Sequence, residues 1–171
     1  AGLGVASLDK DNERYEHKYE FCDLLVTGSG PAGLASAYSA AKNGAKVILA
    51  EDKPRFGGTL LTDDVTIDNL SGKEWADKMI SELKEMPNVI VKNRSQVFGY
   101  YDHNMMVMFE RTGDHLEKKS KYTPRQRLWY IRAKEVLLST GSIERPIVFG
   151  NNDTPGVFLS AAAKEYIKVY G

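Results

Sequence analysis

The chain has 171 residues, 42% of them hydrophobic and 27% charged, which is enough to bury the hydrophobic core of about one domain. Its 23 basic and 23 acidic residues cancel, and this balance argues against a protein that binds nucleic acid or an anionic membrane surface. The single cysteine, Cys22, cannot form a disulfide within the chain, and no apolar run is long enough to cross a bilayer. We therefore predict a cytoplasmic protein that contacts neither nucleic acid nor membrane.

The first half of the sequence predicts a βαβ unit. Residues 1–20 are polar and follow neither the helical nor the strand period, so we predict an irregular arm, followed by a dinucleotide-binding domain over 21–171. The apolar run FCDLLVTG, residues 21–28, is typical of a strand buried on both faces of a parallel sheet. Residues 31–44 begin with proline and end with Asn-Gly, which predicts a helix, and residues 45–51 predict a second buried strand.

The second half predicts a helix, three strands and a last helix. Residues 73–86 place apolar side chains at helical spacing, and Pro87 ends that helix. Strands are predicted over 88–102, 105–112 and 127–141, and residues 160–171 predict a helix capped by Ser160. The fold predicted is therefore α/β and Rossmann-like, with a mostly parallel sheet and an antiparallel β-meander inserted in it. We expect it to be truncated, because a doubly wound sheet normally has a further strand.

A glycine-rich turn followed by an acid marks the candidate binding site. Gly28 permits a tight turn after the first strand, Gly30 lets a pyrophosphate approach the backbone, and Gly33 lets helix and strand pack closely. The helix start offers free N–H groups and the positive end of its dipole to phosphates. Glu51 ends the second strand, where a carboxylate binds the ribose hydroxyls of adenosine and disfavours a 2′-phosphate. The candidate residues here are Gly28, Ser29, Gly30, Pro31, Ala32, Gly33, Glu51, Asp52 and Lys53.

Two further stretches belong to the same site. Residues 56–61, FGGTLL, place backbone amides just beyond the acid, although a flexible surface turn is the alternative. Residues 137–142, LLSTGS, end a strand at the carboxyl edge of the sheet. No spacing of histidine, cysteine, serine or acid indicates a catalytic residue or a metal site. The motif by itself does not distinguish NAD from FAD as the cofactor.

Longer stretches carry a family resemblance. Residues 26–61, VTGSGPAGLASAYSAAKNGAKVILAEDKPRFGGTLL, resemble flavoproteins with two dinucleotide-binding domains. Two other stretches narrow the resemblance to one family, the α subunits of heterotetrameric sarcosine oxidases. They are VFGYYD, residues 97–102, and residues 139–171, which contain ERPIVFGNNDTPG. The resemblance extends from about residue 14 to the end of the chain.

That resemblance implies an oxidoreductase that converts sarcosine and O2 to glycine and H2O2 and passes the one-carbon unit to tetrahydrofolate, giving methylenetetrahydrofolate. It implies a noncovalent NAD here, with FAD, FMN and the folate site elsewhere, and β, γ and δ subunits as partners. The family commonly has Asp then Glu where this chain has Glu51 then Asp52. The resemblance implies that this chain alone does not oxidise sarcosine. It also adds as cofactor-binding residues Gly58, Thr59, Leu60, Val97, Thr140 and Gly141.

Two other hypotheses stay open. The same turn and acid suit an FAD-binding half-domain of a related amine or opine dehydrogenase. Alternatively, the chain is a non-catalytic interaction module in which residues 1–20 and 145–156 bind partner subunits.

Overall fold

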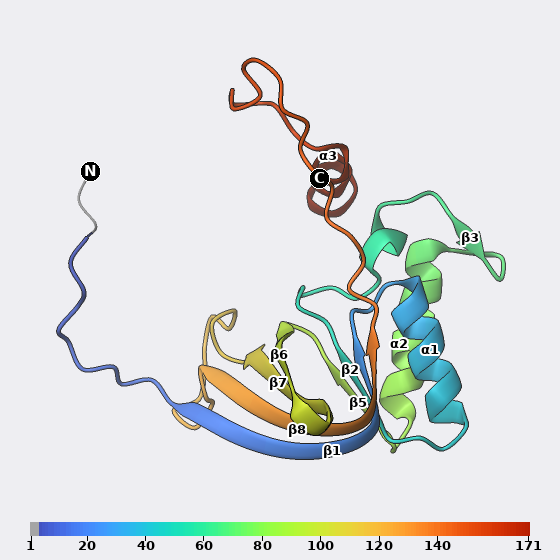
Figure 1. Cartoon of the computed structure of the whole chain (residues 1–171), viewed down its shortest axis with the longest axis vertical. Helices are drawn as coiled ribbons and strands as arrows, with labels where there is room; N and C mark the ends of the chain where they lie inside the picture. The colour runs from blue at the N-terminus through green and yellow to red at the C-terminus, as the bar shows by residue number, and fades with distance from the viewer. Residues whose placement is uncertain (1–3) are drawn as a thin grey trace.

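The computed structural model describes residues 4–171 and has a six-stranded main sheet in the order β5-β2-β1-β8-β7-β6 (Figure 1). β5, β2, β1 and β8 run parallel, and β7 and β6 continue the sheet antiparallel. The predicted α/β fold with a mostly parallel sheet and an antiparallel meander is thereby confirmed. The strands of this sheet are β1 (Tyr15–Thr27), β2 (Val47–Ala50), β5 (Val89–Lys92), β6 (Ser95–Tyr101), β7 (Met105–Arg111) and β8 (Gln126–Leu138).

Two helices cover one face of the parallel strands. α1 (Pro31–Lys42) and α2 (Gly72–Glu85) lie side by side on the same side of the sheet in Figure 1. α2 begins with a capping box, in which Ser71 and Glu74 satisfy each other's backbone N–H groups. Between the helices and the sheet lies a buried apolar cluster that includes Val26, Leu34, Val47, Leu49, Trp75, Met79 and Leu83.

The opposite face is covered by the meander rather than by helices. β6 and β7 curl over that face together with the first half of β8, as Figure 1 shows. The second half of β1 and all of β2 are therefore covered on both sides, which explains their apolar runs. The second cluster contains Cys22, Leu25, Ile48, Ala50, Met106, Met108, Trp129, Ile131 and Ala133. Burial raises the pKa of the Cys22 thiol to about 12, so this cysteine packs as an apolar side chain.

The remaining elements are short. β3 (Thr66–Ile67) and β4 (Leu70–Ser71) form a separate antiparallel pair before α2. Residues 58–61 and 102–104 form 3-10 turns. None of the helices within residues 4–171 is long and apolar enough to cross a membrane.

The prediction of an irregular arm over residues 1–20 was wrong for its last part. β1 begins at Tyr15, which pairs with Gln126, and it runs parallel to β8 from there to Thr27. Residues 15–21 alternate aromatic rings with charged side chains, which is a strand period that a count of aliphatic residues does not register. Residues 4–14 contain neither helix nor strand, and residues 1–3 lie outside the described part of the chain.

Two further boundaries differ from the predictions. The single strand predicted over 88–102 is two strands, because Arg94 adopts φ +51° and turns the chain between β5 and β6. The helix predicted over 160–171 is α3 (Ser160–Glu165) followed by a π-helical turn, Tyr166–Tyr170. Ser160 does not cap it, since Leu159 is the N-cap residue and the Ser160 hydroxyl donates to Glu144 at 2.8 Å.

A buried carboxylate holds the meander to the parallel strands. Glu110 of β7 accepts hydrogen bonds from Trp129 Nε1 at 2.6 Å, Lys92 Nζ at 3.0 Å and Arg127 at 3.0 Å. Burial would by itself raise the pKa of Glu110, but the Trp129 hydrogen bond and the two cations together lower it. Glu110 therefore stays ionised and satisfies three donors at once.

Replacing Glu110 with alanine is expected to lower the free energy of unfolding by about 1–3 kcal/mol at neutral pH, because the donors around it lose their acceptor. Since the folded-state pKa lies below the usual 4.5, this contribution is present above that value and is lost as the pH falls through the folded-state pKa. Denaturant unfolding at neutral and acidic pH measures the loss, with the exposed Glu117→Ala as control. A loss of the same size at both pH values would contradict this account.

Candidate functional site

Four loops meet at the carboxyl end of the parallel strands. They are the turn after β1 (28–30), the end of β2 (51–53), the 3-10 turn with its preceding glycine (57–61) and the end of β8 (139–141). The Gly28 N–H donates to the Ala50 carbonyl at 2.8 Å, which joins the first two loops. Because these loops meet, the structure brings most of the predicted residues to one place. This is the edge at which parallel α/β sheets bind their ligands.

The glycines of the turn have different surroundings. Gly28 adopts φ +97°, and a Cβ atom on it would lie 2.3 Å from the Ser139 carbonyl oxygen. A Cβ atom on Gly33 would lie 2.0 Å from the Gly28 carbonyl oxygen. A Cβ atom on Gly30, by contrast, would meet no other part of residues 4–171 within 4 Å. Gly28 and Gly33 therefore allow close backbone contacts, Gly28 with Ser139 and Gly33 with Gly28. Gly30 instead borders open space, in which a phosphate group would approach the backbone.

The first turn of α1 faces this open space without a side chain to cap it. Gly30 is the N-cap residue, and among the described residues no side chain hydrogen-bonds the first amides. Pro31 occupies the first helical position, where its missing N–H costs nothing. The start of α1 thus offers backbone N–H donors and a positive dipole end to an anion.

Glu51 lies inside the protein rather than at the surface. Its carboxylate accepts the Ser29 N–H at 2.9 Å and the Ser29 hydroxyl at 2.5 Å on one oxygen, and the Lys53 N–H at 3.0 Å on the other. Only 7% of the residue is exposed. Burial raises the pKa of Glu51, and the neighbouring Asp52 carboxyl raises it further. Glu51 therefore fixes the conformation of the turn at residues 28–30 from inside the protein.

Asp52 is the exposed acid at this edge. The residue is exposed, while its backbone carbonyl accepts a hydrogen bond from Arg111 at 2.8 Å, which fixes the chain direction here. Of the two acids predicted to lie at the site, Asp52 is thus the one with a carboxylate open to solvent. The ribose contact assigned to Glu51 stays a prediction, and its carboxylate oxygens are already hydrogen-bonded to Ser29 and Lys53.

The glycine pair after β2, Gly57 and Gly58, packs directly against the turn at residues 28–30. The Gly57 N–H lies 3.1 Å from both the Ser29 carbonyl oxygen and the Ser29 hydroxyl oxygen. A Cβ atom on Gly58 would lie 3.0 Å from Gly30 Cα. Thr59 is exposed beside this contact, whereas Leu60 is buried in the core under the helices. Gly58 and Thr59 border the site, and Leu60 supports it.

Ser139, at the end of β8, lies in the predicted stretch 137–142 but was not itself named as a cofactor-binding residue. Its hydroxyl donates to the carbonyls of Thr27 at 2.8 Å and Gly28 at 3.0 Å. The signal was a hydroxyl residue at a strand end, directly before the predicted Thr140 and Gly141. Thr140 lies against Gly28, and Gly141, at φ +70°, faces open space.

Val97 lies apart from these four loops. It pairs with Met108 between β6 and β7 and is partly buried against the second core cluster. The start of its strand does reach the site edge, since the Ser95 N–H donates to the Glu51 carbonyl at 2.8 Å.

The family described as "FAD dependent oxidoreductase" matches residues 23–113, which is more than half of the chain and includes the turn at residues 28–30 and both acids, Glu51 and Asp52. The chain belongs to this family. The α subunit of sarcosine oxidase from Rhizobium meliloti (strain 1021) is 45% identical over all 171 residues, and that from Corynebacterium sp. (strain U-96) is 40% identical over 173. The chain spans only 17% and 18% of the lengths of these curated relatives.

A solved structure confirms the architecture. L-proline dehydrogenase from P. horikoshii superimposes with a TM-score of 0.72 and 25% sequence identity. The match covers 91% of this chain and 30% of that one. The chain is thus similar throughout to part of an oxidoreductase subunit, with the fold of a flavin- or nucleotide-binding domain.

Replacing Gly33 with alanine is expected to destabilise the protein by about 1–3 kcal/mol, because the new methyl group would meet the rigid backbone at Gly28. Gly150→Ala is the matched control, since a Cβ atom there would meet no other part of the described chain within 4 Å and its φ is not positive. Denaturant unfolding of both variants measures the difference. Equal stability of the two would show that α1 and β1 do not approach as described.

Glu51→Gln is expected to change the pH dependence of stability. Because the folded-state pKa of Glu51 is raised, its stabilising contribution is complete below the usual 4.5 and is lost as the pH rises through the folded-state pKa. The variant should therefore gain stability relative to the native chain between acidic and neutral pH, as denaturant unfolding across that range would measure. Glu117→Gln, which replaces an exposed carboxyl, is the control. A relative loss for Glu51→Gln with rising pH would contradict the burial of this carboxyl.

Proposed function

We propose that the chain is the NAD-binding domain of the α subunit of a sarcosine oxidase. The observation that carries this proposal is 45% identity to such a subunit over all 171 residues, a span that contains the predicted turn and both predicted acids. The intact enzyme would oxidise sarcosine to glycine with O2, giving H2O2, and would transfer the one-carbon unit to tetrahydrofolate. FAD, FMN, the folate site and the β, γ and δ subunits would complete it in the cytoplasm.

The residues of the edge fit the adenosine diphosphate half of such a cofactor. The uncapped start of α1 and the open space at Gly30 suit the diphosphate. The exposed carboxylate of Asp52 suits the ribose hydroxyls, while Glu51 holds Ser29 and the turn in place. Gly58, Thr59 and Thr140 would flank the ligand, and Val97 is proposed for the adenine side. NAD supplies hydride chemistry when it reacts, but here we assign these residues a binding role.

FAD is the second candidate for the same residues. The matched family is described as FAD dependent, and FAD-binding domains share this turn and acid arrangement with NAD-binding domains. Both cofactors present an adenosine diphosphate to the protein, so Gly30 and Asp52 would serve either. Visible flavin absorption in the purified protein would favour FAD over NAD.

An interaction role for the stretch after β8, residues 143–148, is a further candidate. Ile143, Ile147 and Val148 are 79–96% exposed, which is unusual for aliphatic side chains and suits contact with another part of the protein. Such contacts are compatible with a bound cofactor. If the chain were only an interaction module, Gly30→Asp would leave assembly intact and no nucleotide would bind to the native chain.

Calorimetric titration with NAD and with FAD tests the proposal. The native chain should bind NAD, and Asp52→Asn should weaken binding by about tenfold, since hydrogen bonds to a charged acceptor contribute about 1.5 kcal/mol or more. Asp153→Asn is the control. This substitution removes the same charge from an exposed acid that lies in the turn at 150–153. Equal affinities of the two variants would reject Asp52 as the ribose ligand. Binding of FAD in place of NAD would decide for the second candidate.

A further inference from the structure

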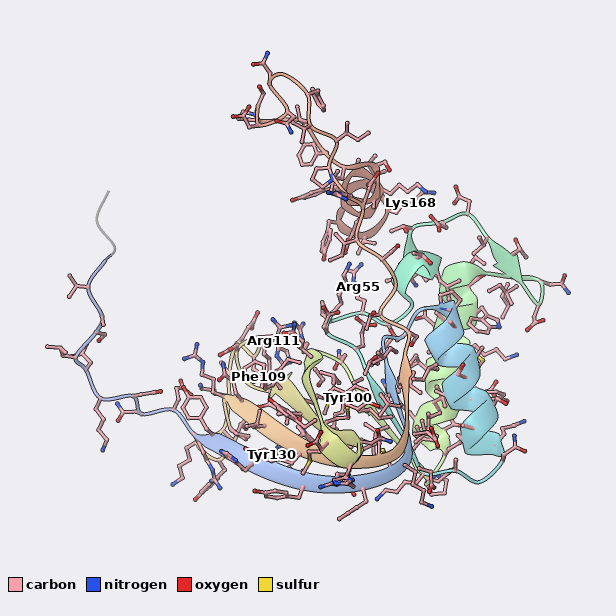
Figure 2. All side chains as sticks on the ribbon, viewed as in Figure 1. Arg55, Tyr100, Phe109, Arg111, Tyr130 and Lys168 are labelled. Carbon is pink, nitrogen blue, oxygen red and sulfur yellow. The ribbon has the colours of Figure 1, made fainter. Side chains whose placement is uncertain are left out.

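The C-terminal helical segment, residues 160–170, is held on the loop after β2 by ion pairs. Figure 2 shows Arg55 between this segment and the body of the domain, with Lys168 on the segment itself. The contacts join residues more than 100 positions apart in the sequence. They are Lys53 with Glu165 at 2.7 and 2.9 Å, Lys164 with Asp63 at 3.0 Å, Lys168 with Asp64 at 2.8 Å, and Arg55 with the Val169 carbonyl at 2.8 Å.

These contacts engage both cations that follow the acids of the candidate site. Lys53 comes directly after Asp52, at the strand end where the adenosine ribose of a dinucleotide lies. In sites that accept a 2′-phosphate, a basic side chain near this position binds it. Here Lys53 is paired with Glu165, and Arg55 donates to the backbone and lies 5.9 Å from the Tyr170 ring. Both cations therefore contact the C-terminal helical segment, and neither is free to bind a 2′-phosphate.

We propose that Glu165 is a specificity-determining residue, which holds Lys53 so that the site takes an adenosine ribose with a free 2′-hydroxyl and rejects a 2′-phosphate. The inference rests on the proposed function, namely that the edge formed by the four loops at residues 28–30, 51–53, 57–61 and 139–141 binds an adenine dinucleotide. It applies equally to NAD and FAD, because it concerns only the adenosine half.

The ion pair acts through charge. Glu165 neutralises the cation beside the ribose position, so the carboxylate of Asp52 repels a phosphate dianion without a free cation beside it to offset that repulsion. The hydrogen bond to Glu165 also raises the pKa of Lys53, so the pair persists at neutral pH. The side chains of Lys53 and Glu165 are 53% and 32% exposed, so solvent screens the pair and its effect on affinity is modest.

Calorimetric titration of the 171-residue chain with 5′-AMP and with adenosine 2′,5′-bisphosphate measures the discrimination directly. The native chain should bind 5′-AMP more tightly. In Glu165→Gln the preference for 5′-AMP should fall about two- to fivefold, the range that an exposed ion pair gives, while the affinity for 5′-AMP itself stays unchanged. In the double variant Lys53→Met with Glu165→Gln the gain in bisphosphate binding should disappear.

Matched variants separate this mechanism from its alternatives. Asp63→Asn breaks a neighbouring ion pair of the same segment without touching Lys53, and Asp153→Asn removes one exposed negative charge elsewhere. Both should keep the native preference. An unchanged preference in Glu165→Gln, or an equal change in Asp63→Asn, would overturn the role of Glu165 while leaving the nucleotide site intact. If the native chain binds neither compound, the proposed function itself fails and this inference with it.

Discussion

The hydrogen bonds between Ser29 and the buried carboxyl of Glu51 hold the candidate site together. They link the turn after β1 to the end of β2, and the same serine hydroxyl lies 3.1 Å from the Gly57 N–H. Three loops that are separate in the sequence thus share one polar centre, shielded from water. A buried polar group is tolerated only when its hydrogen bonds are satisfied, so the turn is confined to the conformation that satisfies them.

The long strands β1 and β8 make this arrangement possible. β8 is parallel to β1 and antiparallel to β7, so it joins the parallel sheet to the meander in one continuous strand. The chain continues from it to Ser139, whose hydroxyl binds the carbonyls at the end of β1. The helices cover one face of the sheet and the meander covers the other. The carboxyl edge is formed by loops and is not covered by either layer. The position of the site therefore follows from the topology.

Much of the fold could be predicted from the sequence because its local signals agree with its packing. Pro31 starts α1, the helix before Pro87 ends at Glu85, and the apolar runs mark β2 and the second half of β1. The first half of β1 was missed because its rings and charges alternate without aliphatic residues. The break between β5 and β6 depends on the positive φ of Arg94, which its residue type does not indicate.

The site could be predicted in outline but not in the roles of its side chains. The pattern of glycines and acids placed the turn correctly, yet only the structure shows that Glu51 points inward and Asp52 is exposed. Lys53 and Glu165 are 112 residues apart in the sequence, so no local sequence pattern could predict that they pair.

Amide chemical-shift mapping by NMR during a titration with ADP tests the central claim most directly. We expect saturable shifts at Gly30, Asp52 and Gly58 and none at Tyr19 in the exposed first half of β1. Shifts confined to other parts of the sheet, or no saturable shifts at all, would contradict a nucleotide site at this edge.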